Sequence, residues 1–415
     1  MSIALSPDPA PCPVGVVPPL CPLAAQAPAD AELSAWLRLV LQPGLTPAVA
    51  RRLLQQAGSA VAVFERPATS WHDTLEPGLA AAVAAPATAA VAAAIAAVQR
   101  WAEQPGHRVL VYAEPDYPAG LRDLHDPPLV LYVRGRVAQL QRPGVALVGA
   151  RLASPAGCEL AQVFGHELAA AGWSVVSGLA RGIDAAAHEG ALRAAGGAGT
   201  LAVMATGIDR IYPRQNLALA QRIVTEGAVV SELPLGTPSA AFQFPRRNRL
   251  VAALSRGIVV LEAAARSGSL ITARLAGELG RDVFAVPGSV HSALSRGCHA
   301  LIREGAYLTE SSADVLGVLA GSPQLPLAAC APAPLSDAGA VGPPAVPAAE
   351  SWVSAAVIRA VLHALGHDPT PLDAVLRRTG LPSPVVQTGL LALELELRAR
   401  RLDDGRWERV TGARP

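Results

Sequence analysis

The most chemically distinctive stretch of the chain is the segment 244–255, which reads FPRRNRLVAALS. It places three arginines and an asparagine in four consecutive positions, with no acidic residue beside them. Pro245 disfavours helical angles at Phe244, so we expect a helix to begin just after the proline. Arginines crowded into the first turn of a helix repel one another and the helix dipole, which lowers stability unless an anion binds there. The segment therefore predicts an anion-binding site.

A second loop that favours anion binding follows the next predicted strand. An apolar run over 257–263 leads into Ser267, Gly268 and Ser269, with Thr272 in the next turn. These residues are small or carry hydroxyls, and they stand where another helix is expected to begin. Two anion-seeking helix ends separated by one strand favour a ligand with several phosphates.

The composition limits where such an attraction can arise. The chain has 415 residues, 51% of them hydrophobic, and a formal net charge of +1, so affinity for a polyanion must come from local patches. All 34 basic residues are arginine, which indicates compositional bias, so only their clustering is informative. The five cysteines are scattered without metal-ligand spacing, and no secretory signal or membrane-spanning apolar run is visible. We therefore expect a soluble cytoplasmic protein with no membrane association, metal or cofactor.

From residue 145 onward, apolar strands alternate with helical runs. This rhythm predicts an α/β fold with a Rossmann-like parallel sheet, in which ligands gather at the carboxyl ends of the strands. The loops after the first two strands contain Gly149 with Arg151, and then a longer set of small and basic residues, Ser177, Gly178, Arg181 and Gly182. The expected strands are 145–149, 174–177, 201–205, 228–231, 258–262 and 283–286.

Other site types are disfavoured by what the chain lacks. The loop at Gly149 does not complete a Gly-x-Gly-x-x-Gly motif, and no lysine is present for a P-loop. Asp184 and His188 share a helix face, but helix capping and an ion pair explain them better than a metal does. Glu262 has the position of a general base, although a buried acceptor of backbone hydrogen bonds is the commoner role. For Phe244 two roles remain equally open: packing in the core, and stacking on a base of the ligand.

The flanking regions predict further domains. Short helices joined by a Pro-Gly turn near the N-terminus are typical of helix-hairpin-helix or SAM-like modules, and three helices with a hairpin near the C-terminus predict a winged helix. We expect a disordered segment over 1–30, a helical domain over 31–104, the Rossmann-like domain over 105–320, a Pro/Ala-rich linker over 321–349 and the winged helix over 350–415.

The central motifs resemble those of the DNA-processing protein A (DprA, also called Smf) family over roughly residues 107 to 315. Ala150 departs from the pattern, because members more often carry Ser or Thr there. The matching text is Asp116-Tyr117-Pro118, 128–135, Val148-Gly149-Ala150-Arg151, 177–184 with Ala187-His188, 244–255, 267–273 and Gly297-Cys298.

The resemblance implies a homodimeric, non-catalytic protein of natural transformation that binds single-stranded DNA and hands it to the RecA recombinase. Two alternatives remain. One is a phosphoribohydrolase-like nucleotide-processing enzyme, although this chain lacks the glutamate that follows the corresponding loop in those enzymes. The other is a protein-binding scaffold that uses the winged helix. The DNA-binding set expected from the residues and the resemblance is Gly149, Arg151, Ser177, Gly178, Arg181, Gly182, Phe244, Arg246, Arg247, Asn248, Arg249, Ser267, Gly268, Ser269 and Thr272.

Overall fold

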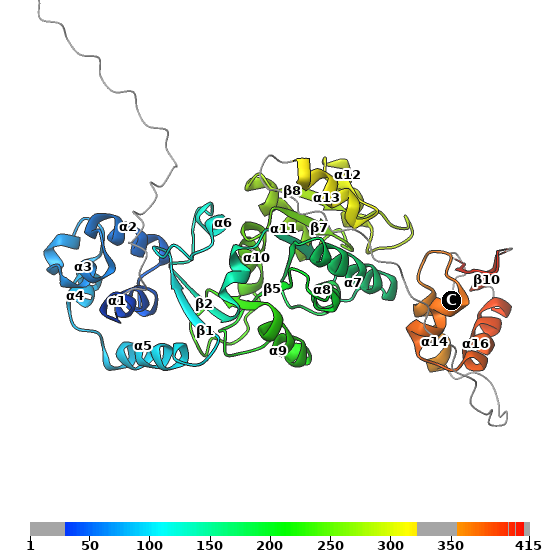
Figure 1. Ribbon diagram of the computed structural model, residues 1–415, viewed down its shortest axis with the longest axis horizontal. Coiled ribbons are helices and arrows are strands. Elements are labelled where there is room, and N and C mark those ends of the chain that lie inside the picture. Colours follow the sequence, from blue (N-terminus) through cyan, green and yellow to red (C-terminus); the bar gives the residue numbers. More distant parts are fainter. Residues whose placement is uncertain (1–29, 322–354, 397, 403, 411–415) are drawn as a thin grey trace, which may run out of the picture. The chain divides into compact units, whose positions relative to one another are not determined.

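The computed structural model describes residues 30–321 and 355–410, without positions 397 and 403 (Figure 1). The predicted disordered segment and the predicted linker lie almost wholly outside the described residues. The chain divides into two compact units, Met1–Trp101 with Leu110–Leu131, and Ala102–Val109 with Tyr132–Pro415.

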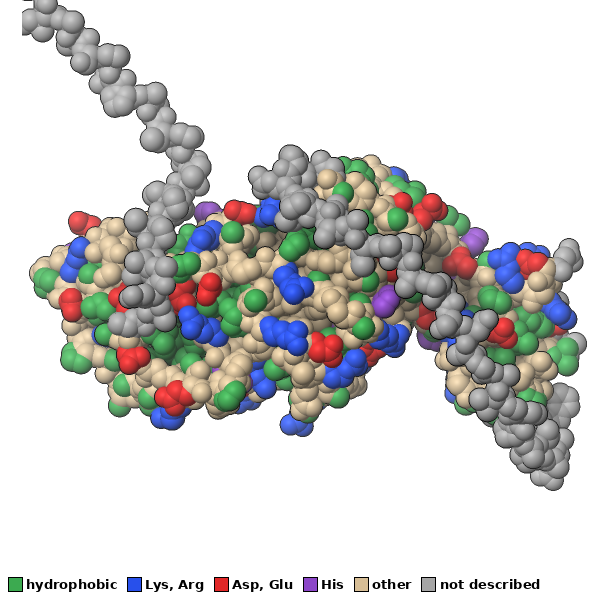
Figure 2. All heavy atoms as spheres, viewed as in Figure 1, with side chains coloured by type: hydrophobic (Ala, Val, Ile, Leu, Met, Phe, Trp, Pro, Cys, Tyr) green, Lys and Arg blue, Asp and Glu red, His purple; other side chains and the backbone are tan. Residues whose placement is uncertain are grey.

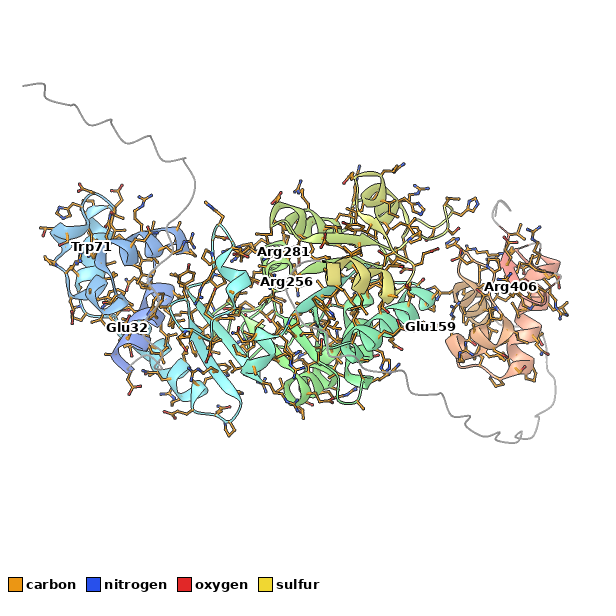
Figure 3. All side chains as sticks on the ribbon, turned by 45° about the horizontal axis from the view of Figure 1, so that its top comes forward. Glu32, Trp71, Glu159, Arg256, Arg281 and Arg406 are labelled. Atoms are coloured by element: carbon orange, nitrogen blue, oxygen red, sulfur yellow. The ribbon has the colours of Figure 1, made fainter. Side chains whose placement is uncertain are left out.

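The first unit is helical, as the sequence predicts. Thr46 caps its second helix by accepting a hydrogen bond from the Val49 amide, and Gly58 ends that helix in the left-handed region (φ 87°). Glu32 accepts hydrogen bonds from the Trp36 ring and the Ala60 amide, each at 3.1 Å, and is labelled in Figure 3. The helices are α1 (Asp30–Leu41), α2 (Pro47–Ala57), α3 (Ala60–Glu65), η1 (Ala68–Trp71), α4 (Pro77–Ala84), α5 (Ala89–Ala102) and α6 (Ala119–Arg122).

In the described part of the chain, no single helix has both the length and the apolar character needed to cross a membrane. Helices α4 and α5 reach these limits only when taken together, as a pair bent by 53°.

The described residues form a nine-stranded sheet in the order β1-β2-β6-β5-β4-β3-β7-β8-β9. Pairing from β6 through β9 is parallel, whereas β2 runs antiparallel to β6. All six strands expected from 145 onward are present, because each is an apolar run ended by a loop of small residues. The strands are β1 (His107–Val111), β2 (Val130–Gly135), β3 (Gly144–Val148), β4 (Ser174–Ser177), β5 (Thr200–Val203), β6 (Ala228–Ser231), β7 (Gly257–Val260), β8 (Asp282–Ala285) and β9 (Tyr307–Leu308).

Helices alternate with these strands and bury the sheet. Leu147, Phe164, Ile183 and Phe284 belong to one core built from β3, α7, α8 and β8 (Figure 1). Helices α10 and α11 pack on each other and on β5, β7 and β8. The helical elements are η2 (Val137–Gln141), α7 (Pro155–Ala170), α8 (Ile183–Arg193), η3 (Arg214–Asn216), α9 (Leu217–Glu226), α10 (Gln243–Ala253), α11 (Gly268–Glu278), α12 (Arg296–Arg303) and α13 (Ser312–Gly321).

The C-terminal helices and hairpin form the expected winged-helix elements. Leu390 and Leu393 are buried with Val361 and Val386 in the core of this domain. The elements are α14 (Ala355–Leu365), α15 (Leu372–Thr379), α16 (Ser383–Leu395) and the antiparallel strands β10 (Ala399–Arg401) and β11 (Trp407–Arg409).

Candidate nucleic-acid interface

The loops after β3 and β4 meet backbone to backbone at the carboxyl edge of the sheet. The Ile183 amide donates to the Ala150 carbonyl at 3.2 Å. Gly182 has φ +75°, and a Cβ there would lie 2.3 Å from the same carbonyl oxygen, while a Cβ on Gly149 would lie 2.5 Å from the Ile183 side chain. Glycine at both positions therefore allows the contact that holds Arg151 at this edge.

A cavity of about 180 Å³ lies between these loops and the start of α11. Ser267 caps α11 as predicted: its Oγ accepts from the Ser269 amide and lies 2.8 Å from the Ser269 hydroxyl. Arg151 and Asn248 also line the cavity, so the start of α11 faces cationic and amide groups. The lining is Val148, Gly149, Arg151, Ala180, Asp184, Arg247, Asn248, Ser267, Gly268, Ser269 and Thr272.

Two carboxylates of the chain already accept hydrogen bonds from backbone amides beside the cavity. Glu262 accepts hydrogen bonds from the Ser154 amide (2.8 Å) and hydroxyl (2.5 Å) at the start of α7. Asp184, in the first turn of α8, accepts from the Gly178 (3.1 Å) and Ala180 (3.3 Å) amides. Glu262 therefore accepts a backbone hydrogen bond as expected, but it is only half-buried, so the expectation of a buried residue was wrong.

A groove of about 900 Å³ adjoins the cavity and shares Arg151 and Ala180 with it. Asp209 also lines the groove, but its carboxylate accepts from the Gly236 amide at 2.8 and 3.0 Å. Within the described residues, none of the groove arginines forms an ion pair, which leaves the groove strongly cationic. These arginines are Arg134, Arg151, Arg181, Arg210 and Arg214.

The start of α10 differs from the prediction. The helix begins at Gln243, before Pro245, because Gln243 is buried and its Oε1 accepts from the Ala240 amide at 2.8 Å. Pro245 is then the third residue of the helix, where a missing amide hydrogen removes no helical bond. Since the arginines follow the first turn, the explanation of their clustering by the helix start was wrong.

The three clustered arginines have three different environments. Arg246 is exposed. Arg247 is only 5% exposed, and its guanidinium donates to the Val203 carbonyl. Arg249 forms an ion pair with Glu232, and both side chains are about nine-tenths buried (12% and 13% exposed). The prediction that all three line one strand of phosphates is therefore wrong for Arg249, whose charge is already neutralised.

Arg247 is held in a site that only glycine permits. A Cβ on Gly178 would lie 2.0 Å from the Arg247 guanidinium. Burial lowers the pKa of Arg247 to about 10, an effect that Asp184 opposes and Arg151 reinforces. Arg247 therefore lies beneath the surface of the site and links the ends of β4, β5 and α10.

His188 is a core residue beneath the site. It is fully buried, and its Nδ1 lies 2.7 Å from Thr200 Oγ1, which itself donates to the Val175 carbonyl at 2.5 Å. The Thr200 hydroxyl oxygen therefore accepts a hydrogen bond from the Nδ1–H of His188. The expected capping by Asp184 is wrong, because α8 has no side-chain cap and Asp184 accepts from amides of the preceding loop. The expected ion pair between Asp184 and His188 is also wrong, because the imidazole bonds to Thr200.

His188 should make stability fall in acid. Burial, followed by the charge of Arg247, lowers the pKa of His188 to about 3, below its ordinary 6.5, so folding favours the neutral ring. This stabilisation is complete above pH 6.5 and is lost at about 1.4 kcal/mol per pH unit as the pH falls toward 3. His188→Asn keeps an N–H for Thr200 and removes the titration. Urea unfolding at pH 4, 5 and 6.5 should give the variant a flatter dependence; equal slopes would contradict this role.

Several groove residues were missed from the sequence. Arg210, Tyr212 and Arg214 lie in the loop after β5, to which no site was assigned from the sequence. Arg256 precedes β7 at the opposite edge of the sheet, beside Arg281, which precedes β8 at the same register position (Figure 3). Figure 2 shows arginines spread over the visible face with acidic side chains among them. The groove is therefore distinguished by arginines that form no ion pair, and not by the number of its arginines.

The winged helix carries arginines both with and without ion pairs among its described residues. Helix α16 contains no basic residue and exposes Gln387, Thr388 and Leu391. Three arginines at the hairpin pair with nearby carboxylates: Arg398 with Glu396, Arg400 with Glu408 and Arg406 with Asp404, at 2.6–2.9 Å. Arg359, Arg377, Arg401 and Arg409 form no ion pair within the described residues.

Comparison with known proteins agrees with this geometry. Residues 108–320, about half of the chain, match the model of DNA recombination-mediator protein A, and residues 343–405 match the DprA winged helix domain. The chain belongs to the DNA recombination-mediator protein A family. The resemblance seen in the sequence is thereby confirmed.

Individual DprA-family relatives are similar over much of their length. Protein Smf of Escherichia coli (strain K12) is 40% identical over 297 residues, which cover 71% of this chain and 75% of that protein. DNA processing protein DprA of Streptococcus pneumoniae is 46% identical over 204 residues, covering 48% and 70%. The X-ray structure of DprA from Streptococcus pneumoniae aligns with a TM-score of 0.55 at 35% identity, covering 70% of this chain and 98% of that one.

Proposed function

We propose that this protein binds single-stranded DNA along the connected groove and cavity, and that it acts in the cytoplasm during DNA uptake and natural transformation. The observation that carries the proposal is the set of five groove arginines without ion pairs, in a groove that adjoins the cavity at the start of α11. Several unpaired arginines in one groove can contact successive phosphates of a single strand. Membership of the DNA recombination-mediator protein A family supports the same ligand.

Competition between oligonucleotides tests this function. A labelled single strand of about 30 nucleotides should shift in a gel at low protein concentration, and excess unlabelled single strand should displace it far better than the same length of duplex. Equal competition by the duplex would contradict the proposal.

Delivery of the strand to the RecA recombinase is the finer part of the proposal and follows from the family. RecA should form filaments faster on a strand precoated with a single-strand-binding protein when this protein is added. An unchanged rate would restrict the function to binding and protection.

We further propose that the protein forms a homodimer through the edge of the sheet at β9. Tyr307 and Leu308 there are 47% and 53% exposed, which is unusual for large apolar side chains on an edge strand. The hollow beside them, about 850 Å³, mixes Arg274 and Arg281 with Glu278 and Glu304, so it does not extend the cationic groove. Sedimentation equilibrium should give twice the mass of the chain.

A binding role without catalysis is also proposed. Glu262, which has the position of a general base, is engaged by Ser154, and the loop at Ser267 lacks a following glutamate. Incubation with nucleoside monophosphates should release no free base; release would favour the phosphoribohydrolase-like alternative.

A further inference from the structure

Two aromatic rings and one arginine form a connected group in the groove. The Arg151 guanidinium carbon lies 4.9 Å from the centre of the Phe244 ring. On the same ring, Tyr212 packs at a tilt, with centroids 5.7 Å apart and planes at 57°. Phe244 is half-buried, whereas Tyr212 is 48% exposed. Phe244 is therefore engaged by two neighbours, and the open ring in this group is Tyr212.

The position of Tyr212 is fixed by its surroundings. Asn216, four residues later in the same loop, donates to the Leu179 (2.9 Å) and Ala180 (3.1 Å) carbonyls, and so ties the loop after β5 to the loop after β4. The Thr206 hydroxyl donates to the Arg210 carbonyl at 2.6 Å on the other side. A ring that is already held in place loses little entropy when a ligand stacks on it.

We propose that Tyr212 is the ring on which a nucleobase of the bound strand stacks, and that Phe244 is a positioning residue that holds Arg151 toward the phosphates. This inference rests on the proposed function. Tyr212 lines the groove among its arginines, so a base on its ring belongs to a strand whose phosphates those arginines contact. A base in a duplex is already stacked and paired, so this contact also selects unpaired strands.

The test compares Tyr212→Ala with Leu217→Ala. Leu217 lines the same groove and is also 48% exposed, but it has no π face. On oligo(dT), Tyr212→Ala should lower the affinity by about 5- to 150-fold, Leu217→Ala should lower it much less, and Tyr212→Phe should bind like the unmodified protein. The slope of log affinity against log salt should be unchanged in Tyr212→Ala, because no phosphate contact is removed.

An abasic strand of equal length separates stacking from a general loosening of the groove. On that strand the unmodified protein and Tyr212→Ala should bind equally, because neither has a base to stack. An equal loss on both strands, a loss matched by Leu217→Ala, or no loss on oligo(dT) would each overturn the inference. Failure of the unmodified protein to bind oligo(dT) would contradict the proposed function itself. If the unmodified protein binds with a salt-dependent affinity and Tyr212→Ala binds equally well, only the stacking inference is contradicted.

Discussion

Replacing Arg151, Arg181 and Arg214 together with alanine should lower the affinity for single-stranded DNA by about a thousandfold or more. All three side chains are exposed in the groove and form no ion pair within the described residues. A hydrogen bond to a charged group contributes roughly 1.5–3 kcal/mol, so each lost arginine costs at least about tenfold. Each single-strand phosphate contact also adds about 0.7 to the salt slope, so the slope should fall by about 2. Filter binding across a salt series measures both quantities.

A matched variant separates local contact from net charge. Arg193, Arg222 and Arg303 lie on α8, α9 and α12, outside the lining of the groove, of the cavity at Arg151 and of the hollow beside β9, and their replacement removes the same three charges. This variant should keep nearly all of the affinity and slope. If both triple variants lose affinity equally, the protein attracts DNA through its overall charge and the groove is not the site.

The sequence allowed the fold to be predicted because its main signals are local. The strands from β3 to β8 are short, mainly apolar runs, and small residues mark several of their ends: β4 and β6 end in serine, β8 ends in alanine, and Gly149 follows β3. The edge of the sheet that holds the site follows from parallel topology alone. Ser267 could likewise be placed at a helix start because a hydroxyl and small residues are the local signature of a cap.

The state of each arginine could not be predicted, because it depends on residues far away in the chain. No acidic residue stands beside the cluster in the sequence, yet Glu232 pairs with Arg249 across a 17-residue separation. Asp184, which lies on α8, likewise raises the pKa of Arg247 through its negative charge. A cluster of cations in a sequence therefore does not show which of them are free, and here the free cations come mainly from other loops.

Removing the buried guanidinium of Arg247 should have the largest effect on stability. Arg247→Met leaves the Val203 carbonyl without the donor from Arg247, and it leaves the buried Asp184 carboxylate without the larger of its two compensating charges, the smaller being Arg151. Breaking such an arrangement costs about 3–5 kcal/mol. Urea unfolding at pH 7 should show a loss of this size. The double variant Arg247→Met with Asp184→Asn should recover part of this stability. The new side-chain amide oxygen can still accept hydrogen bonds from the Gly178 and Ala180 amides, and it carries no charge.

The pH dependence identifies the group responsible. Burial raises the pKa of Asp184 above its ordinary value, and Arg247 opposes that rise. Folding thus favours the protonated acid, so its contribution is most favourable below the ordinary pKa and is lost as the pH rises through the folded value. Without Arg247 this pKa rises further, so the stability gap between the unmodified protein and Arg247→Met should be wide at pH 7 and narrow toward pH 4. In the Asp184→Asn background the gap should not change with pH. A constant gap in both backgrounds would mean that Arg247 stabilises the fold by packing and by its bond to Val203, and not by its charge.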